Sequence, residues 1–339
     1  MKKKIISMLL ASVMAVSMMA CGSDATETSD EATADASTET EATGDVTYNV
    51  GVIQLVQHEA LDAATTGFSD ALKEKLGDNV VITVQNAAGD SATCATIANS
   101  YVSEGVDLIM ANATASLQAA TAATNEIPVV GTSITDYATA LEIDNWEGTT
   151  GINATGTADL APLDGQADMI NELFPDAKNV GILYCSAEPN SIFQADTITG
   201  YLTEYGYNVT AYTFSDTNDI ASVTQTACNE CDVLYIPTDN TAASCTETIN
   251  NIALTAGVPI VAGEEGICTG CGVATLSISY YDIGYAAGLM AYDILVNGTD
   301  PSTYPIEYAS NFTKKYNADI CEKLGITVPD DYEAIIVEE

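Results

Sequence analysis

Short apolar runs alternate with amphipathic stretches over most of the chain from residue 46 to residue 296. Each run has the length of a strand; the clearest is 180–184, which a polar loop and a helical stretch follow. Between the runs, apolar residues such as Leu61, Phe68 and Leu72 recur at helical spacing. Successive strand–helix units require right-handed crossovers and a parallel sheet, in which doubly covered strands are continuously apolar. The pattern therefore predicts an α/β fold.

This alternation defines the expected elements. Strands are expected at residues 46–55, 80–84, 107–111, 128–131, 180–184, 207–212, 232–236, 259–262 and 273–278. Helices are expected at residues 61–76, 91–104, 116–124, 164–173, 192–205, 220–229, 242–256 and 281–296. The alternation lapses at 137–163, where we expect the first crossing between lobes, and a strand-like and short helical coda runs from residue 305.

The two halves of the chain resemble each other. Residues 48–54 read YNVGVIQ and residues 178–184 read KNVGILY, and residues 127–131 are likewise echoed by 258–263. A length of 339 residues suits two lobes of roughly 100–150 residues each. Open α/β sheets bind ligands at the carboxyl ends of their strands. We therefore expect two similar lobes with a functional cleft between them.

The first 45 residues predict export and anchoring. Three lysines at 2–4 precede an apolar stretch at 5–20 that is too short for a comfortable transmembrane helix, so residues 1–20 are typical of a signal peptide. Cys21 follows a small residue as in a bacterial lipobox, which predicts its lipidation; an ordinary secretory signal with an incidental Cys21 is the alternative. Residues 21–45 are acidic and poor in large apolar side chains, which predicts a disordered tether.

The charge of the chain excludes some functions. Nine basic residues, all lysine, stand against 48 acidic ones, for a net charge of −39. Nucleic-acid binding is not expected, because neutralising phosphates needs a basic face. Without arginine, a bound carboxylate must be held by helix N-termini, backbone N–H groups, hydroxyls or a lysine.

Polar side chains follow the carboxyl ends of the predicted strands in both lobes. Hydroxyls, amides and carboxylates at these positions suit a small polar ligand, although Ser, Thr, Asp and Asn there also serve simply as helix caps. We expect the ligand-binding residues to be Gln54, His58, Thr114, Ser116, Asp136, Asn190, Ser191, Asp239 and Asn240.

The sequence does not indicate an enzyme. Its one histidine, His58, has no nucleophile at a recognisable spacing, and there is no G-x-S-x-G elbow. The glycine-rich loops that bind dinucleotides or nucleotides are also missing from the sequence. We therefore expect no catalytic residues and no cofactor.

The eight cysteines besides Cys21 could be free thiols, disulfides or ligands of a structural metal. Two C-x-x-C pairs, at 228–231 and 268–271, are separated by more than the usual zinc-ribbon spacing. Buried free thiols, disulfides and a structural metal all stay open, and we commit to no metal site.

Several motifs together resemble the Trp/Tyr-type (TrpX-like) substrate-binding lipoproteins of bacterial ABC importers. They cover about residues 49–329, essentially the whole predicted folded part. The motifs on which the resemblance rests include GVIQ at 51–54, HEALD at 58–62, NAAGD at 86–90, ATASLQA at 113–119, EPNS at 188–191, PTDN at 237–240 and YYDIG at 280–284.

The resemblance implies a type I periplasmic-binding-protein fold, in which two Rossmann-like lobes with parallel sheets are joined by a three-segment hinge. Lobe 1 is then expected at 46–158 plus about 280–303, and lobe 2 at 159–279 plus about 304–339. The helix at 281–296 should return to lobe 1. The implied mechanism is hinge closure around a ligand, without covalent chemistry.

The resemblance also implies a ligand and partners. An aromatic amino acid is expected, delivered to a membrane permease with its ATPase. Its α-carboxylate would rest on Thr114, Ser116 and the N–H groups of the following helix, and Asp239 or Asp136 would meet its α-ammonium group. Relatives commonly carry proline and alanine where this chain has Ala115-Ser116, which leaves the exact ligand open.

A lipid-anchored monomer is expected on the outer face of the cytoplasmic membrane of a bacterium without an outer membrane. The alternatives are the same fold binding a nucleoside or a sugar, a solute sensor, and a cell-wall or adhesive surface protein without a saturable small ligand.

Overall fold

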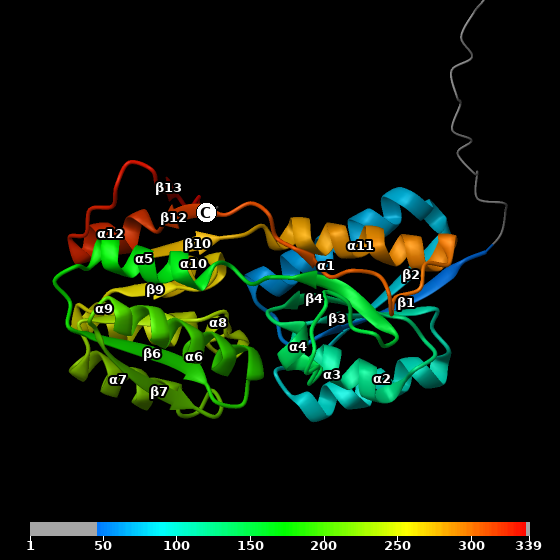
Figure 1. Ribbon diagram of the computed structural model, residues 1–339, viewed down its shortest axis with the longest axis horizontal. Helices are drawn as coiled ribbons and strands as arrows, with labels where there is room; N and C mark the ends of the chain where they lie inside the picture. The colour runs from blue at the N-terminus through cyan, green and yellow to red at the C-terminus, as the bar shows by residue number, and fades with distance from the viewer. Residues whose placement is uncertain (1–45, 337–339) are drawn as a thin grey trace, which may run out of the picture. The chain divides into compact units, whose positions relative to one another are not determined.

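The computed structural model describes residues 46–336, which form one compact unit with two β-sheets (Figure 1). The predicted signal peptide, the lipidation site Cys21 and most of the tether lie outside the described residues. None of the described helices combines the length and the apolar character that crossing a membrane requires.

The first sheet has six parallel strands in the order β11-β5-β4-β3-β1-β2. The strands are β1 (Tyr48–Gln54), β2 (Val80–Asn86), β3 (Leu108–Asn112), β4 (Val129–Ile134), β5 (Ala154–Ala158) and β11 (Glu307–Tyr308). The helices of this lobe are α1 (Glu59–Leu76), α2 (Ser91–Glu104), α3 (Thr114–Ala123), α4 (Tyr137–Ala140) and α11 (Tyr280–Asn297), with a 3₁₀ turn η1 (Gly77–Asn79). One core lies between the sheet and α2 and α3, and another between the sheet and α1 and α11. Both faces are therefore covered, as the continuous apolar runs predict.

The second sheet has seven strands in the order β13-β12-β10-β9-β8-β6-β7, parallel except for the antiparallel pair β10 and β12. The strands are β6 (Asn179–Cys185), β7 (Asn208–Phe214), β8 (Val233–Ile236), β9 (Ile260–Ala262), β10 (Ala274–Ser277), β12 (Thr313–Tyr316) and β13 (Glu333–Ala334). The helices are α5 (Leu163–Leu173), α6 (Pro189–Glu204), α7 (Ile220–Glu230), α8 (Asn240–Ala243), α9 (Thr246–Ala256), α10 (Glu265–Cys271) and α12 (Ala318–Leu324). Helices α7, α9 and α10 cover one face, and α5, α6 and α12 cover the other.

The chain crosses between the two lobes three times, at 159–162, 278–279 and 309–312. After the second crossing α11 packs closely on α1, as Figure 1 shows for the orange and blue helices. Glycines make this approach possible: a Cβ on Gly67 would lie 2.1 Å from the carbonyl oxygen of Tyr281, and one on Gly284 would lie 2.1 Å from that of Ala64. The chain after the third crossing returns to the second sheet through β12.

Several features differ from the sequence-based expectations, and α4 and α10 are helices where none was expected. Strand β5 occupies part of the stretch where no strand was expected, because its sequence ATGTA contains only small side chains. The single helix expected at 242–256 is two helices, α8 and α9. The boundary expected near residue 304 also lies later, because Glu307–Tyr308 pairs with β5 of the first sheet before the chain crosses.

Candidate functional site in the cleft between the lobes

The carboxyl ends of strands from both sheets surround a small enclosed cavity of about 10 Å³, which is room for one water-sized group. The residues that carry its polar lining are His58, Ser133, Thr135, Asp159, Asn190, Thr238, Asp239, Asn240, Glu264 and Tyr280. They come from both lobes and from two of the crossings. The position agrees with the expected cleft.

His58 and Asn240 meet across this cavity, with Nε2 of His58 lying 3.2 Å from Oδ1 of Asn240. The Nδ2 atom of Asn240 donates to a carboxylate oxygen of Glu188 at 2.7 Å, which fixes the amide orientation and makes Oδ1 an acceptor. Burial lowers the pKa of His58, so its ring is neutral and carries its proton on Nε2. The buried Nδ1 atom has no partner in the protein and is therefore an acceptor available to a ligand.

Asp159 follows β5 directly and is 3% exposed. Its Oδ2 atom accepts a 2.9 Å hydrogen bond from the hydroxyl of Tyr280, the first residue of α11. The other oxygen, Oδ1, is buried without a partner. Burial raises the pKa of this carboxyl to about 6. The cavity thus receives a second buried acceptor.

Ser133 supplies a third polar atom without a partner. Its Oγ is buried and unpaired, and its backbone has φ of 56°, at a register irregularity between β4 and β5. A left-handed conformation at a serine is strained by roughly 1–3 kcal/mol and is a frequent feature of binding sites. Of the five buried unpaired side-chain atoms among the described residues, the three on His58, Ser133 and Asp159 line this one cavity. Such atoms are rare in native proteins, so their convergence makes this cavity the candidate ligand site.

In the other two carboxylates of the site, Asp239 and Glu264, both oxygens accept hydrogen bonds. Asp239 accepts hydrogen bonds from the backbone N–H groups of Cys185 and Ala242 and from the hydroxyl of Ser191. Burial, together with the nearby charge of Glu188, raises the pKa of Asp239 to about 7. Burial likewise raises the pKa of Glu264 to about 7, although backbone N–H groups at the start of α10 bind its carboxylate. No lysine lines the described cavity, so its wall presents mainly acceptors.

A second chamber of about 270 Å³ adjoins the cavity and shares Asn240 with it. Its wall comes from the loops after β1, β2, β6 and β7 and from the first residues of α3 and α8. The small or apolar side chains among its lining residues are Leu55, Val56, Ala88, Ala115, Cys185 and Ala187. This chamber offers the space for an apolar side chain that the cavity lacks.

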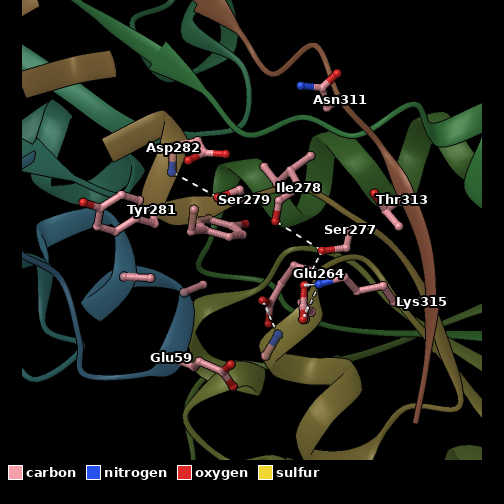
Figure 2. Close-up of a pocket in the computed structure, with 15 residues that line it drawn as sticks. Glu59, Glu264, Ser277, Ile278, Ser279, Tyr281, Asp282, Asn311, Thr313 and Lys315 are labelled. Carbon is pink, nitrogen blue, oxygen red and sulfur yellow. Dashed lines mark hydrogen bonds and ion pairs between the residues drawn. The ribbon is translucent and has the colours of Figure 1, made fainter. Parts of the chain in front are cut away.

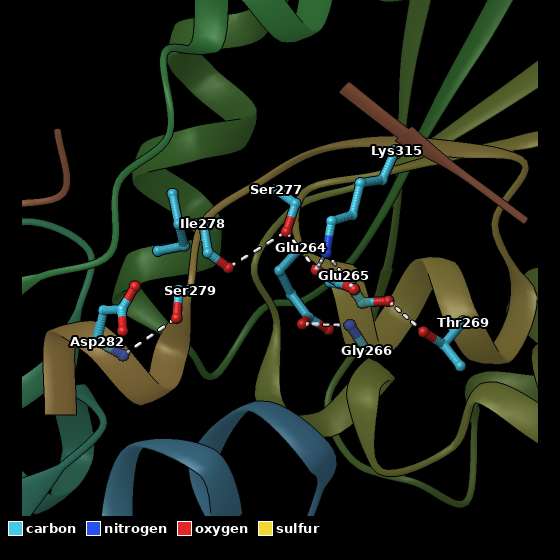
Figure 3. Close-up of polar contacts among 9 residues, drawn as sticks. All are labelled: Glu264, Glu265, Gly266, Thr269, Ser277, Ile278, Ser279, Asp282 and Lys315. Carbon is cyan, nitrogen blue, oxygen red and sulfur yellow. Dashed lines mark hydrogen bonds and ion pairs between the residues drawn. The ribbon is translucent and has the colours of Figure 1, made fainter. Parts of the chain in front are cut away.

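A third cavity, of about 380 Å³, lies along the second and third crossings and shares Glu264 and Tyr280 with the small one. Figure 2 shows Glu59 of α1 facing this cavity from the first lobe. In Figure 3, Lys315 of β12 forms an ion pair with Glu265 of α10 at 2.7 Å, and Ser277 donates to the same carboxylate. These contacts tie α10 to the hinge strands of the second lobe.

Four of the nine predicted ligand residues line the small cavity: His58, Asn190, Asp239 and Asn240. Ser191 lies behind them and donates to Asp239. Gln54 is turned toward α1, where its amide bonds Asp62 and Thr65. Gln54 and Ser191 are therefore placed as supports of the site in this conformation.

The other three predicted residues do not line the cavity or the chamber. Ser116 is fully buried against Cys94, and Thr114 is buried at the start of α3. Ala115 faces the chamber instead, because successive helical residues point in directions about 100° apart. Asp136 caps α4 by accepting from the N–H of Thr139.

Asp159 and Tyr280 were not expected at the site. Asp159 follows a strand without an apolar run, and Tyr280 stands where an apolar helix begins, so neither carries a strong pattern. Ser133 and Glu264 follow predicted strands, and this position was the only feature of the sequence that pointed to a place in the site.

Residues 49–337 match the family described as ABC transporter substrate binding protein. The chain belongs to this family. It is 36% identical over 297 residues to the tyrosine-binding protein of Clostridioides difficile strain R20291, covering 86% of this chain and 84% of that protein.

Two solved structures of about 30% sequence identity are similar to this substrate-binding protein over most of its length. One is an ABC domain from Streptococcus pneumonia in complex with L-Trp, which is 31% identical with a TM-score of 0.81 and covers 86% of this chain and 100% of that one. The other is the ligand-free, open structure of a substrate binding protein with adhesive properties from Clostridium difficile, which is 33% identical with a TM-score of 0.65 at the same coverage. The fold is thus that of type I periplasmic binding proteins, and the described conformation is closer to the tryptophan complex than to the open form.

The eight described cysteines are all free, and seven of them are buried. Cys228 and Cys231 lie at the end of α7, before β8, away from the carboxyl ends of the strands. Burial raises the pKa of Cys228, Cys268 and Cys271, which makes these thiols poor nucleophiles. Within residues 46–336 no group of three or more His, Cys, Asp or Glu side chains is arranged to hold a metal ion.

Proposed function

We propose that this substrate-binding protein captures an aromatic amino acid, tyrosine or tryptophan, and delivers it to an ABC permease with its ATPase. The observation that carries the proposal is the set of three unpaired polar atoms on His58, Ser133 and Asp159 around one water-sized cavity. Two of them are acceptors and the third is a hydroxyl. An α-ammonium group has the size of a water molecule and carries three N–H donors, so it suits this cavity.

The rest of the ligand extends into the adjoining chamber. Its volume of about 270 Å³ leaves room for a phenol or an indole ring, and small or apolar side chains lie among the polar residues of its wall. Two relatives, a tyrosine-binding protein and a protein in complex with L-Trp, support the same ligand class. Asp159 replaces Asp239 and Asp136 as the carboxylate proposed to meet the ammonium group, because both oxygens of Asp239 already accept hydrogen bonds and Asp136 does not line the cavity, whereas Oδ1 of Asp159 has no partner.

The α-carboxylate then lies near the start of α3, where Ala113 has φ of 87° and Ala115 faces the chamber. Backbone N–H groups at this helix start are the expected donors, since the chain has no arginine. Thr114 and Ser116 support this segment rather than line the chamber.

Members of this family act outside the cytoplasm and serve ABC transporters. We further propose that Cys21 anchors this one by a lipid to the outer face of the cytoplasmic membrane and that 21–45 is its tether. A sugar, a nucleoside or a sensing role is the competing function. The acceptor-rich cavity favours a ligand with an ammonium group over a neutral sugar.

The test uses residues 22–339, unfolded and refolded to remove any bound solute, and isothermal titration with the twenty amino acids, nucleosides and simple sugars. Tyrosine and tryptophan are expected to bind. N-acetyl-L-tyrosine, which lacks the ammonium group, is expected to bind at least tenfold more weakly. Binding only of a sugar or a nucleoside would overturn the ligand, and equal binding of the acetylated compound would overturn the role of the cavity.

A further inference from the structure

We infer that Tyr280 is a positioning residue that couples ligand occupancy to closure of the lobes through its hydrogen bond to Asp159. This inference rests on the proposed function, because it requires a ligand donor at Oδ1 of Asp159. It goes beyond that function because Tyr280 is assigned a role in the hinge.

The two residues stand at the lobe 1 ends of two different crossings. Asp159 is the first residue after β5, where the chain leaves the first sheet, and Tyr280 follows the return crossing at 278–279. Their 2.9 Å hydrogen bond is buried and spans 121 positions of sequence. One bond thus links the start of the first crossing to the helix residue that directly follows the second, and both crossings must bend when the lobes move.

Neighbouring contacts fix the lobe 1 ends of both crossings. The hydroxyl of Thr157 in β5 donates to the carbonyl of Ile283 in α11 at 3.1 Å. Tyr280 lines the same cavity as Thr238 and Glu264 of the second lobe. The Asp159–Tyr280 pair therefore lies where the fixed part of the first lobe meets the cavity wall of the second.

The two oxygens of Asp159 have different surroundings. Oδ2 is bound to the hinge by Tyr280, and Oδ1 is buried at the cavity without a partner. A buried unsatisfied carboxylate oxygen disfavours the closed state until a donor reaches it. A ligand N–H group at Oδ1 removes this penalty in the closed state only, so it shifts the population toward closure. Without the Tyr280 hydroxyl, Oδ2 loses this buried hydrogen bond even when the ligand is bound.

The test compares Tyr280→Phe with Tyr281→Phe in residues 22–339. Tyr281 is the matched control, because it neighbours Tyr280 on α11 and donates to a carboxylate, Asp70, but is exposed and lines the third cavity rather than the small one. The measurements are stopped-flow binding of L-tyrosine and L-tryptophan, small-angle X-ray scattering with and without saturating ligand, and the thermal midpoint of each ligand-free variant.

Tyr280→Phe is expected to raise the dissociation rate about tenfold or more, as loss of a hydrogen bond to a charged acceptor implies. The association rate should stay within about twofold, and the decrease in radius of gyration on ligand addition should shrink. The preference for tyrosine over N-acetyl-L-tyrosine should persist, because Asp159 is still present. Tyr281→Phe should behave like the parent protein.

Parent-like dissociation and closure in Tyr280→Phe would overturn the inference while leaving the proposed function intact. Equal losses in Tyr280→Phe and Tyr281→Phe would also overturn it, since the effect would then be general to α11. If the parent protein closes only on a sugar or a nucleoside, the proposed function fails first and the inference, which requires an ammonium donor, fails with it.

Discussion

The imidazole of His58 and the amide of Asn240 meet at 3.2 Å across the cleft, and this contact joins α1's N-cap residue to the first residue of α8. Because Glu188 fixes the amide, the same contact fixes the histidine proton on Nε2. The acceptor at Nδ1 is therefore created by the closed arrangement of both lobes.

Replacing Asp159 by Asn should weaken tyrosine or tryptophan binding about 10–100-fold, because the ammonium group loses its charged acceptor. The same change should raise the thermal midpoint of the ligand-free protein, since it removes a buried carboxylate with one unsatisfied oxygen. Titration calorimetry and differential scanning calorimetry measure the two effects. Asp136→Asn, which keeps a helix cap at α4, is the control and should leave both unchanged.

The ligand-free protein should become more stable as the pH falls from about 7 toward 4. Burial raises the pKa of Asp159 to about 6 and that of Glu264 to about 7, so the folded state binds more protons than the unfolded state in this window. Each carboxyl should contribute roughly 1–3 kcal/mol, complete below the ordinary carboxyl pKa near 4 and lost above about 7. His58 opposes the trend, because burial lowers its pKa.

Urea unfolding at pH 5 and pH 8 tests this dependence. Asp159→Asn should remove part of the difference between the two pH values. Tyrosine affinity should fall below about pH 6, where Asp159 becomes protonated in the ligand-free form. A parent protein that loses stability steadily from pH 8 to pH 5 would contradict the assignment.

Filling the chamber should impair binding of large ligands. Ala115→Leu places a branched side chain where the ring is proposed to lie, and we expect tryptophan affinity to fall at least tenfold. Ala119→Leu, one turn further along α3 and outside the chamber, is the matched control. Calorimetry with both variants distinguishes a steric effect in the chamber from a change in the helix; equal affinities would show that the ring lies elsewhere.

Asp239→Ala should destabilise the second lobe by roughly 2–4 kcal/mol, because three donors on Cys185, Ser191 and Ala242 lose their buried acceptor. Its effect on ligand affinity should be secondary to this loss. Urea denaturation measures the change. Asp196→Ala, at an exposed position of α6, should change stability by less than about 0.5 kcal/mol.

One thiol should react quickly with a disulfide reagent in the native protein once Cys21 is replaced. Cys245 is partly exposed, whereas the other seven described cysteines are buried. Cys245→Ser should abolish the fast phase, and the remaining seven thiols should react on the timescale of unfolding. Several fast-reacting thiols in Cys245→Ser would show that the second lobe opens more readily than its packing implies.

The sequence was most informative where a strand is an uninterrupted apolar run. Residues 180–184 and 232–236 predicted β6 and β8, and the helix expected at 91–104 matches the bounds of α2. Strand β5 was not predicted, because Gly156 and its small neighbours carry no apolar signal and are placed by close packing. A Cβ on Gly156 would lie 1.9 Å from the carbonyl oxygen of Gly131.

The sequence by itself determined two α/β lobes, their repeated strand–loop–helix units and the edge of each sheet at which polar residues gather. These features follow from local periodicity, which each segment carries alone. Only the tertiary structure decided which polar atoms are already paired, as at both oxygens of Asp239, and which lack a partner, as at Oδ1 of Asp159. That distinction depends on contacts between distant segments, such as the bond from Tyr280 to Asp159, and no local pattern encodes it.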